Sequence, residues 1–248
     1  MKIQIRFRNH PSSVLFYTFI TKFTQYIKRE TILKYIIPVI IEGMQNCSLN
    51  SKLILAKHTA WLLKTVSYSN LRIQIHELLI KKFCHSPNFQ DRITFIEFCF
   101  QITELMSKHY FKEYFLNSLC SLWASKTTEE AYRLCKYAPS FRKALLINDT
   151  EQASILMSYL KDYSLKSTKK YRYVAEAAGE SLKIIMSQAF VVSDKAEKDL
   201  VNMEISIKKA EKKEIEEAKK QEIELLIKQA RMDVMSKIAH PGPKSKVW

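Results

Sequence analysis

The residues best suited to chemistry in this chain are its histidines and cysteines. Metal sites and nucleophilic catalysts bring such groups together at short helical spacings or in recognisable motifs. No two histidines stand three or four residues apart, and no HExxH motif occurs. Cys84 and His85 are adjacent, but neighbouring residues on a helix point about 100° apart. We therefore expect this pair to be structural, and we assign no metal ligand. The histidines are His10, His58, His76, His85, His109 and His240.

Two pairs of acidic residues are the remaining candidates for catalysis. Glu97 and Glu104 flank an apolar stripe, as expected of a solvated helix face, whereas Glu129 and Glu130 open a helical pattern, where they cap the helix and complement its dipole. The chain has no GxGxxG, no Walker-type phosphate loop and no GxSxG motif. We therefore predict a protein that is not an enzyme, with no catalytic residue, no cofactor-binding residue and no cofactor.

Composition indicates which elements must position these side chains. Only 3 of the 248 residues are glycine and 6 are proline, which leaves little material for the tight turns of β-sheets. With 47% hydrophobic residues the chain is long enough for a sizeable core, and we predict an all-α fold. The cysteines lie in apolar helical patterns without CxxC spacing, so we expect buried free thiols and a cytoplasmic, reducing location. They are Cys47, Cys84, Cys99, Cys120 and Cys135.

Residues 88–146 show the repeating unit most clearly. Apolar residues of 89–106 form two adjoining stripes at helical spacing, and a second amphipathic helix follows over 110–124. The linker around Lys108 and His109 is short enough to require an antiparallel return. Such a hairpin exposes more apolar surface than its own partner covers, so it needs like neighbours on both sides.

Polar capping residues mark where the successive units begin. Ser13, Asn50, Asn88 and Thr127, the last with Glu130 as a capping box, are separated by 37, 38 and 39 residues. This period is near that of two-helix HEAT-type repeats. We predict a HEAT-like, armadillo-like right-handed superhelical solenoid of antiparallel helix pairs, with a compact helical bundle as the alternative. The expected second helices are 31–44, 70–83, 110–124 and 148–163, and a fifth unit begins near residue 167.

Composition changes abruptly after residue 192, where a long charged segment begins. We divide the chain into a lead-in (1–12), the HEAT-like repeat array (13–192), a long charged helix or coiled coil (193–239) and a disordered tail (240–248). The heptad rhythm of the long helix breaks with a five-residue step to Ile215. A solvated single helix, whose Glu204 pairs with Lys208, and a self-associating coiled coil therefore both remain open.

We expect the two parts of this helix to have different functions. Its N-terminal part is predicted to cap the last repeat. Its C-terminal part is predicted to present Ile223, Leu226 and Ala230 as a candidate partner-binding stripe.

Net charge raises a second possible function. The chain carries a formal charge of +15, of which residues from 193 onward supply only +2. A basic helical-repeat nucleic-acid-binding protein, or another protein-interaction adaptor, is therefore the alternative to a scaffold. Tyr171 and Tyr173, interleaved with basic residues, resemble a weak base-stacking platform. No apolar run near the N-terminus is convincing as a membrane span, and a mitochondrial presequence is the less favoured interpretation of residues 1–29.

Three stretches of the chain resemble the HEAT-repeat regulatory subunits of serine/threonine phosphatases. They are 92–96 (RITFI), 111–115 (FKEYF) and 134–139 (LCKYAP), followed by a charged helix. The resemblance is closest to protein phosphatase 4 regulatory subunit 4-like proteins and could extend from about residue 32 to 239. It implies a curved, non-catalytic scaffold that binds a serine/threonine phosphatase catalytic subunit or its substrates.

The chain departs from that family at a repeat turn. The family's Asp-Pro and Val-Arg pattern is absent from 125–131 (SKTTEEA), so we expect repeat stacking to depend more on apolar contacts. Lys52 is expected to occupy the corresponding arginine position in an earlier repeat, where it lacks the planar guanidinium.

Overall fold

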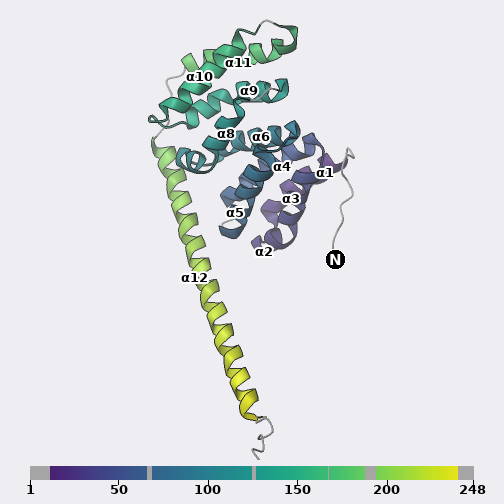
Figure 1. Cartoon of the computed structure of the whole chain (residues 1–248), viewed down its shortest axis with the longest axis vertical. Helices are drawn as coiled ribbons and strands as arrows, with labels where there is room; N and C mark the ends of the chain where they lie inside the picture. The colour runs from purple at the N-terminus through teal and green to yellow at the C-terminus, as the bar shows by residue number, and fades with distance from the viewer. Residues whose placement is uncertain (1–11, 66–68, 125–126, 167, 188–193, 240–248) are drawn as a thin grey trace, which may run out of the picture.

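The structure is a computed structural model that describes residues 12–65, 69–124, 127–166, 168–187 and 194–239 (Figure 1). Every regular element in these ranges is helical, which confirms the all-α prediction for them. The predicted lead-in, except for Ser12, and the predicted disordered tail lie outside the described residues. The α-helices are α1 (Ser12–Phe23), α2 (Arg29–Thr31), α3 (Ile37–Asn46), α4 (Leu49–Thr65), α5 (Ser69–Leu78), α6 (Phe89–Leu105), α7 (Lys108–Phe111), α8 (Asn117–Leu122), α9 (Thr128–Ala144), α10 (Thr150–Ser164), α11 (Arg172–Ser187) and α12 (Asp194–Ala239).

Helices α1, α4, α6, α9 and α11 pack one on the next, in that order along the chain. A returning segment follows each of the first four, and these hairpins lie one above another from α1 to α10 and α11 (Figure 1). Three of the returning segments contain a π-helical turn, at η2 (Ile32–Ile36), η3 (Leu79–Cys84) and η4 (Lys112–Leu116). Pro38 follows the first of these turns, near the start of α3. Helix α9 runs through Pro139, so that proline does not end it.

Two of the predicted N-caps are confirmed by hydrogen bonds. The Asn88 side chain accepts from the backbone N–H of Gln90 at 3.0 Å, and Thr127 accepts from that of Glu130 at 3.4 Å. The linker between α6 and α7 is shorter than expected. Ser107 caps α7, so Lys108 and His109, predicted to lie in the linker, are the first residues of the helix.

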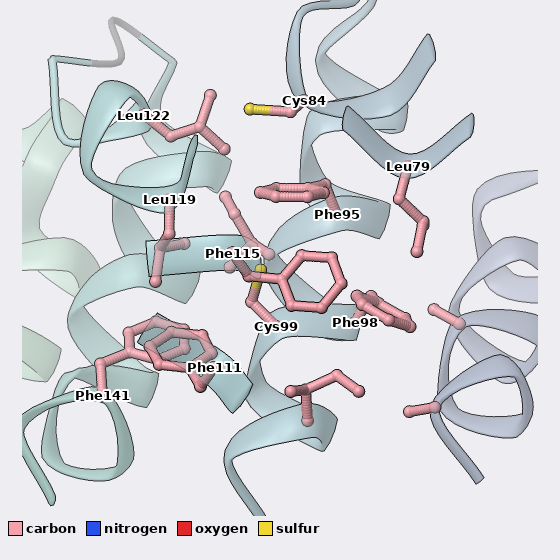
Figure 2. Close-up of a cluster of buried hydrophobic side chains, with 14 of the residues drawn as sticks. Leu79, Cys84, Phe95, Phe98, Cys99, Phe111, Phe115, Leu119, Leu122 and Phe141 are labelled. Atoms are coloured by element: carbon pink, nitrogen blue, oxygen red, sulfur yellow. The ribbon is translucent and has the colours of Figure 1, made fainter. Parts of the chain in front are cut away.

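Apolar side chains form a continuous core between successive hairpins (Figure 2). Phe95 and Phe98 of α6 meet Phe115 of η4, whose ring centroid lies 5.2 Å from that of Phe98. Phe111 stacks on Phe141 of the next hairpin. This placement explains why one hairpin alone would leave apolar surface in water.

All five cysteines are free thiols, as predicted. Cys84, Cys99 and Cys135 are buried, while Cys47 and Cys120 are half-buried. Burial raises the pKa of the Cys135 thiol to about 12 and that of Cys120 to about 11. These two thiols are therefore protonated at neutral pH and poor nucleophiles.

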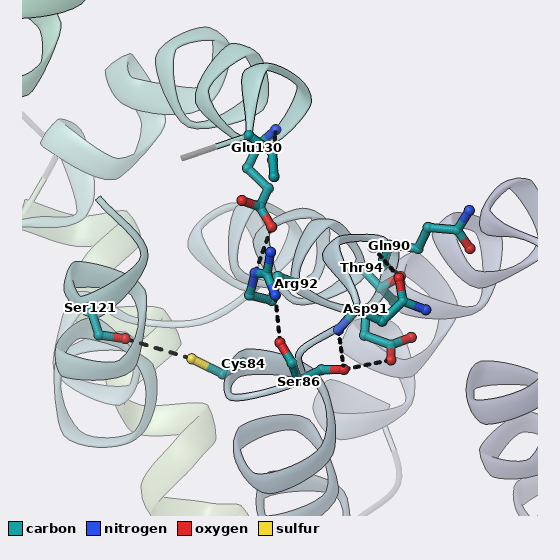
Figure 3. A network of polar contacts seen from close by, with 10 residues as sticks. Cys84, Ser86, Gln90, Asp91, Arg92, Thr94, Ser121 and Glu130 are labelled. Carbon is teal, nitrogen blue, oxygen red and sulfur yellow. Dashed lines mark hydrogen bonds and ion pairs between the residues drawn. The ribbon is translucent and has the colours of Figure 1, made fainter. Parts of the chain in front are cut away.

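Buried ion pairs connect the starts of successive long helices, and Figure 3 shows the pair of Arg92 with Glu130. Lys52 of α4 binds Asp91 of α6 at 2.5 Å. Arg92, the next residue of α6, donates from Nε to Glu130 of α9 at 2.6 Å and from Nη1 to the Ser86 carbonyl at 2.6 Å. A basic residue on one helix thus binds an acidic residue on the next, at two successive junctions.

We expected successive hairpins to stack mainly through apolar contacts, and this prediction is wrong for these two junctions. It rested on the residues missing at one turn and overlooked Glu130 as an acidic partner. The prediction holds better at the junction of α9 with α11. There Ala131, which corresponds to Arg92 in the preceding hairpin, carries no charge. There α9 and α11 pack through apolar side chains and a 2.6 Å hydrogen bond from Ser181 Oγ to the Cys135 carbonyl.

Candidate functional site: the C-terminal helix

Helix α12 is a single helix of 46 residues, which at 1.5 Å per residue is about 70 Å long. Its first turns lie beside the start of α7, it runs on past α5, and its remaining length extends beyond the stack (Figure 1). The contacts that fix it lie on α5 and α7, not on the last helix, α11. The prediction that it caps the last repeat is therefore wrong. Its first half instead covers the returning segments of the second and third hairpins.

Two glutamates of α12 bind the start of α7. Glu204 accepts hydrogen bonds from the backbone N–H of Ser107 at 2.6 Å and from the Ser107 hydroxyl at 2.5 Å. Glu197, one heptad earlier, accepts from the backbone N–H of Lys108 at 2.9 Å. The first N–H groups of a helix have no partner within it, so these carboxylates satisfy donors that would otherwise need water. Glu204 is buried and was predicted to pair with Lys208, which instead bonds Glu113.

A third glutamate continues the same heptad spacing. Glu211 pairs with Arg72 of α5 at 3.1 Å, and both side chains are buried. Residues seven apart share one face of a helix, so Glu197, Glu204 and Glu211 form an acidic line directed at the body. Sequence inspection missed this line, although the repeated seven-residue spacing is visible in the sequence.

A polar cluster lies beneath α12. His76 is buried, and its Nε2 shares a 2.8 Å hydrogen bond with the Tyr110 hydroxyl. The Arg72 guanidinium lies 5.8 Å from the Tyr110 ring centroid. Burial, with a smaller contribution from the Arg72 charge, lowers the pKa of His76 to about 4. A groove of about 470 Å³ opens beside the cluster, lined by residues including Tyr114 and Ile215.

The buried histidines make stability depend on pH. His76 stays neutral in the folded protein down to about pH 4, whereas an unfolded histidine takes up a proton below about 6.5. The contribution of His76 to the free energy of unfolding is therefore present above pH 6.5 and is lost as the pH falls towards 4, by about 2 kcal/mol at pH 5. We expect His76→Gln, which can still bond Tyr110, to flatten urea-measured stability between pH 7 and 5. Burial also lowers the pKa of His58 to about 4, so His58 should preserve part of the pH dependence of stability in that variant.

Substitution of an exposed histidine provides the matched control. His85 is exposed, so His85→Gln should leave the pH dependence as in the parent protein. An unchanged slope in His76→Gln would contradict the assignment.

The structure does not assemble the candidate catalytic groups. His58 bonds Thr24 at 3.0 Å in the first two hairpins, far in sequence from the partners of His76. Cys84 is buried whereas His85 is exposed, so the two do not act as a pair. No group of three His, Cys, Asp or Glu side chains in the described ranges could hold a metal ion.

The candidate carboxylates have structural contacts. Glu97 accepts from Tyr137 at 2.7 Å and from Arg133 at 3.3 Å, so it ties α6 to α9 instead of facing solvent as predicted. Glu104 is exposed, as predicted. Neither residue lies in an arrangement of paired acids that would suit catalysis.

Beyond Ile215 the helix projects from the body, with Glu216 and Lys219 still lining the groove beside Arg72 and His76 (Figure 1). We call residues 216–239 the arm, and its described side chains are exposed. The break in the heptad at Ile215 thus coincides with the point where α12 leaves the stack. Ile223 is 55% exposed, Leu226 is 64% exposed, and Ala230 is also exposed. That this stripe binds a partner remains a prediction.

No family model, curated protein or solved structure matches this chain. No helix in the described part of the chain is both long and apolar enough to cross a membrane.

Proposed function

We propose that this protein is a non-catalytic scaffold or regulatory subunit, built as a HEAT-like right-handed superhelical solenoid, that binds protein partners. The solenoid is supported by contacts between successive hairpins at similar sequence separations. The Thr24–His58 and His76–Tyr110 hydrogen bonds each join residues 34 apart. The ion pairs Lys52–Asp91, Arg92–Glu130 and Lys112–Asp149 join residues 39, 38 and 37 apart. Such nearest-neighbour contacts favour a repeat stack over the alternative of a compact bundle.

One observation carries the binding function: the arm holds large apolar side chains in water. Ile223, Leu225, Leu226 and Ile227 are all 48% exposed or more. Exposed apolar surface of this kind on a helix is typical of helices that dock into partner grooves through residues at i, i+3 or i+4 and i+7. Ile223, Leu226 and Ala230 follow that spacing, so the arm is the proposed protein-binding surface.

The identity of the partner has weaker support. A serine/threonine phosphatase catalytic subunit is proposed from the family resemblance alone. Nucleic acid is less favoured, because the rings of the candidate stacking platform are engaged in packing. Tyr171 contacts Tyr163, and Tyr173 contacts Tyr132.

Truncation after Ile215 tests this proposal. The deleted arm makes little contact with the body, so we expect the melting temperature to change little. The truncated protein should lose most of the proteins that the full chain captures from cell extract, and captured serine/threonine phosphatase activity should fall with them. Nuclease treatment should leave capture by the full chain intact. Equal capture by both proteins would refute the arm as the binding surface, and nuclease-sensitive capture would favour nucleic acid.

A further inference from the structure

The arm has one apolar face that is separate from the face used for docking. On a helical projection Ile223, Ile227 and Ala230 lie within about 60° of one another. Their centre lies about 120° from the line of Glu204 and Glu211, which faces the body. A second helix can therefore approach this face without meeting the body from which the arm projects.

The charges along the arm indicate what that second helix is. Residues 216–227 carry four acidic and two basic side chains, a net of −2, whereas 228–239 carry three basic and one acidic, a net of +2. An antiparallel copy of the same arm places each half against the half of opposite charge. A parallel copy would set each half against the half of like charge along the whole arm.

The apolar positions fit the same orientation. With Ile227 at heptad position a and Ala230 at d, antiparallel pairing sets each isoleucine against the small alanine of the other copy. A parallel pair would set alanine against alanine and leave a gap. Glu224 and Arg231 occupy e positions and face each other across the antiparallel seam, once on each side of the two-fold axis. Both side chains are exposed in the single chain.

We propose that two copies of this protein associate through their arms as an antiparallel helix pair, with Ile227 packed on Ala230 and Glu224 paired with Arg231. This inference rests on the proposed function and names the occupant of its binding surface. The two-fold symmetry places one helical stack at each end of the paired arms, which are each about 36 Å long. The dimer is thus a double-ended scaffold.

Sedimentation equilibrium of the full-length protein at increasing concentration tests the association. We expect a concentration-dependent dimer that Ile227→Asp abolishes, because the pairing would bury the introduced charge. Leu225→Asp is the matched control: Leu225 is 66% exposed and lies on the opposite side of the arm, so that variant should still dimerise. A wild-type chain that stays monomeric up to its solubility limit, or equal loss of dimer in both variants, would overturn the proposal.

Charge reversal tests the orientation. Glu224→Arg and Arg231→Glu should each raise the dimer dissociation constant roughly tenfold, and the double variant should restore it. Failure of the double variant to recover would exclude the antiparallel pairing.

The dimer measurement and the truncation experiment together distinguish this proposal from the wider binding function. Loss of partner capture on truncation with a monomeric full chain would refute only the dimer, whereas a dimer without arm-dependent capture would refute only the wider binding function.

Discussion

Replacement of Arg92 by methionine is expected to destabilise the helical stack by about 3–5 kcal/mol. The guanidinium of Arg92 donates to Glu130, whose side chain is 0% exposed, and also to the Ser86 carbonyl. Methionine retains much of the apolar packing but removes the positive charge and both donors. The fully buried Glu130 carboxylate would then lose the charge of Arg92, and the free-energy cost of removing that carboxylate from water would no longer be offset. Urea unfolding followed by circular dichroism measures the loss.

Lys81 provides the control for this prediction. It pairs with Glu77 on the surface of the second hairpin, where both side chains are largely exposed. Lys81→Ala should therefore cost about 0.5 kcal/mol or less. A double-mutant cycle with Glu130→Gln should give a coupling energy well above 1 kcal/mol. Coupling indistinguishable from zero would mean that the ion pair does not hold the two helices together.

Replacement of Glu204 by alanine is expected to release the docked half of α12, at a cost of about 2–4 kcal/mol to that contact. The substitution removes both acceptors of Ser107 and leaves the backbone N–H at the start of α7 without its carboxylate. Because the lost contacts lie between α12 and α7, the effect should be local opening more than global unfolding. Trypsin should then cut within residues 198–213 much faster than in the parent protein, as followed by mass spectrometry.

Glu222→Ala is the matched control for Glu204→Ala. Glu222 is an exposed glutamate on the arm of the same helix, so its removal changes charge and helix propensity by similar amounts without touching the body. Glu197→Ala should have an intermediate effect, because Glu197 makes one such hydrogen bond and is half-buried. Equal proteolysis of the three variants would show that the glutamate contacts do not fix α12.

Local signals made the helical elements predictable from sequence. Scarcity of glycine excluded sheets, and short-range capping chemistry located the starts of α6 and α9 at Asn88 and Thr127. These signals depend on residues within one helical turn, so they require no knowledge of tertiary structure. The break in the heptad at Ile215 was also visible in the sequence, but the sequence did not indicate that α12 leaves the stack there.

The positions of long-range partners were not predictable in this way. The bond from Ser107 to Glu204 joins residues 97 apart, and nothing local to either residue indicates the other. A surface i,i+4 pair of Glu204 with Lys208 was the simpler interpretation of the same residues. Only the packed arrangement shows that α12 turns back along α7 and α5, which converts a solvated acidic stripe into a buried contact.

Hydrogen–deuterium exchange along α12 of the full-length protein, at concentrations low enough to keep it monomeric, tests the central claim most directly. The claim is that one helix has a docked half, held by glutamates, and a projecting arm that we propose to bind protein. Residues 197–215 should exchange slowly and residues 216–239 fast, with the change falling near Ile215. Uniformly fast exchange, or protection of the arm equal to that of the docked half, would contradict it.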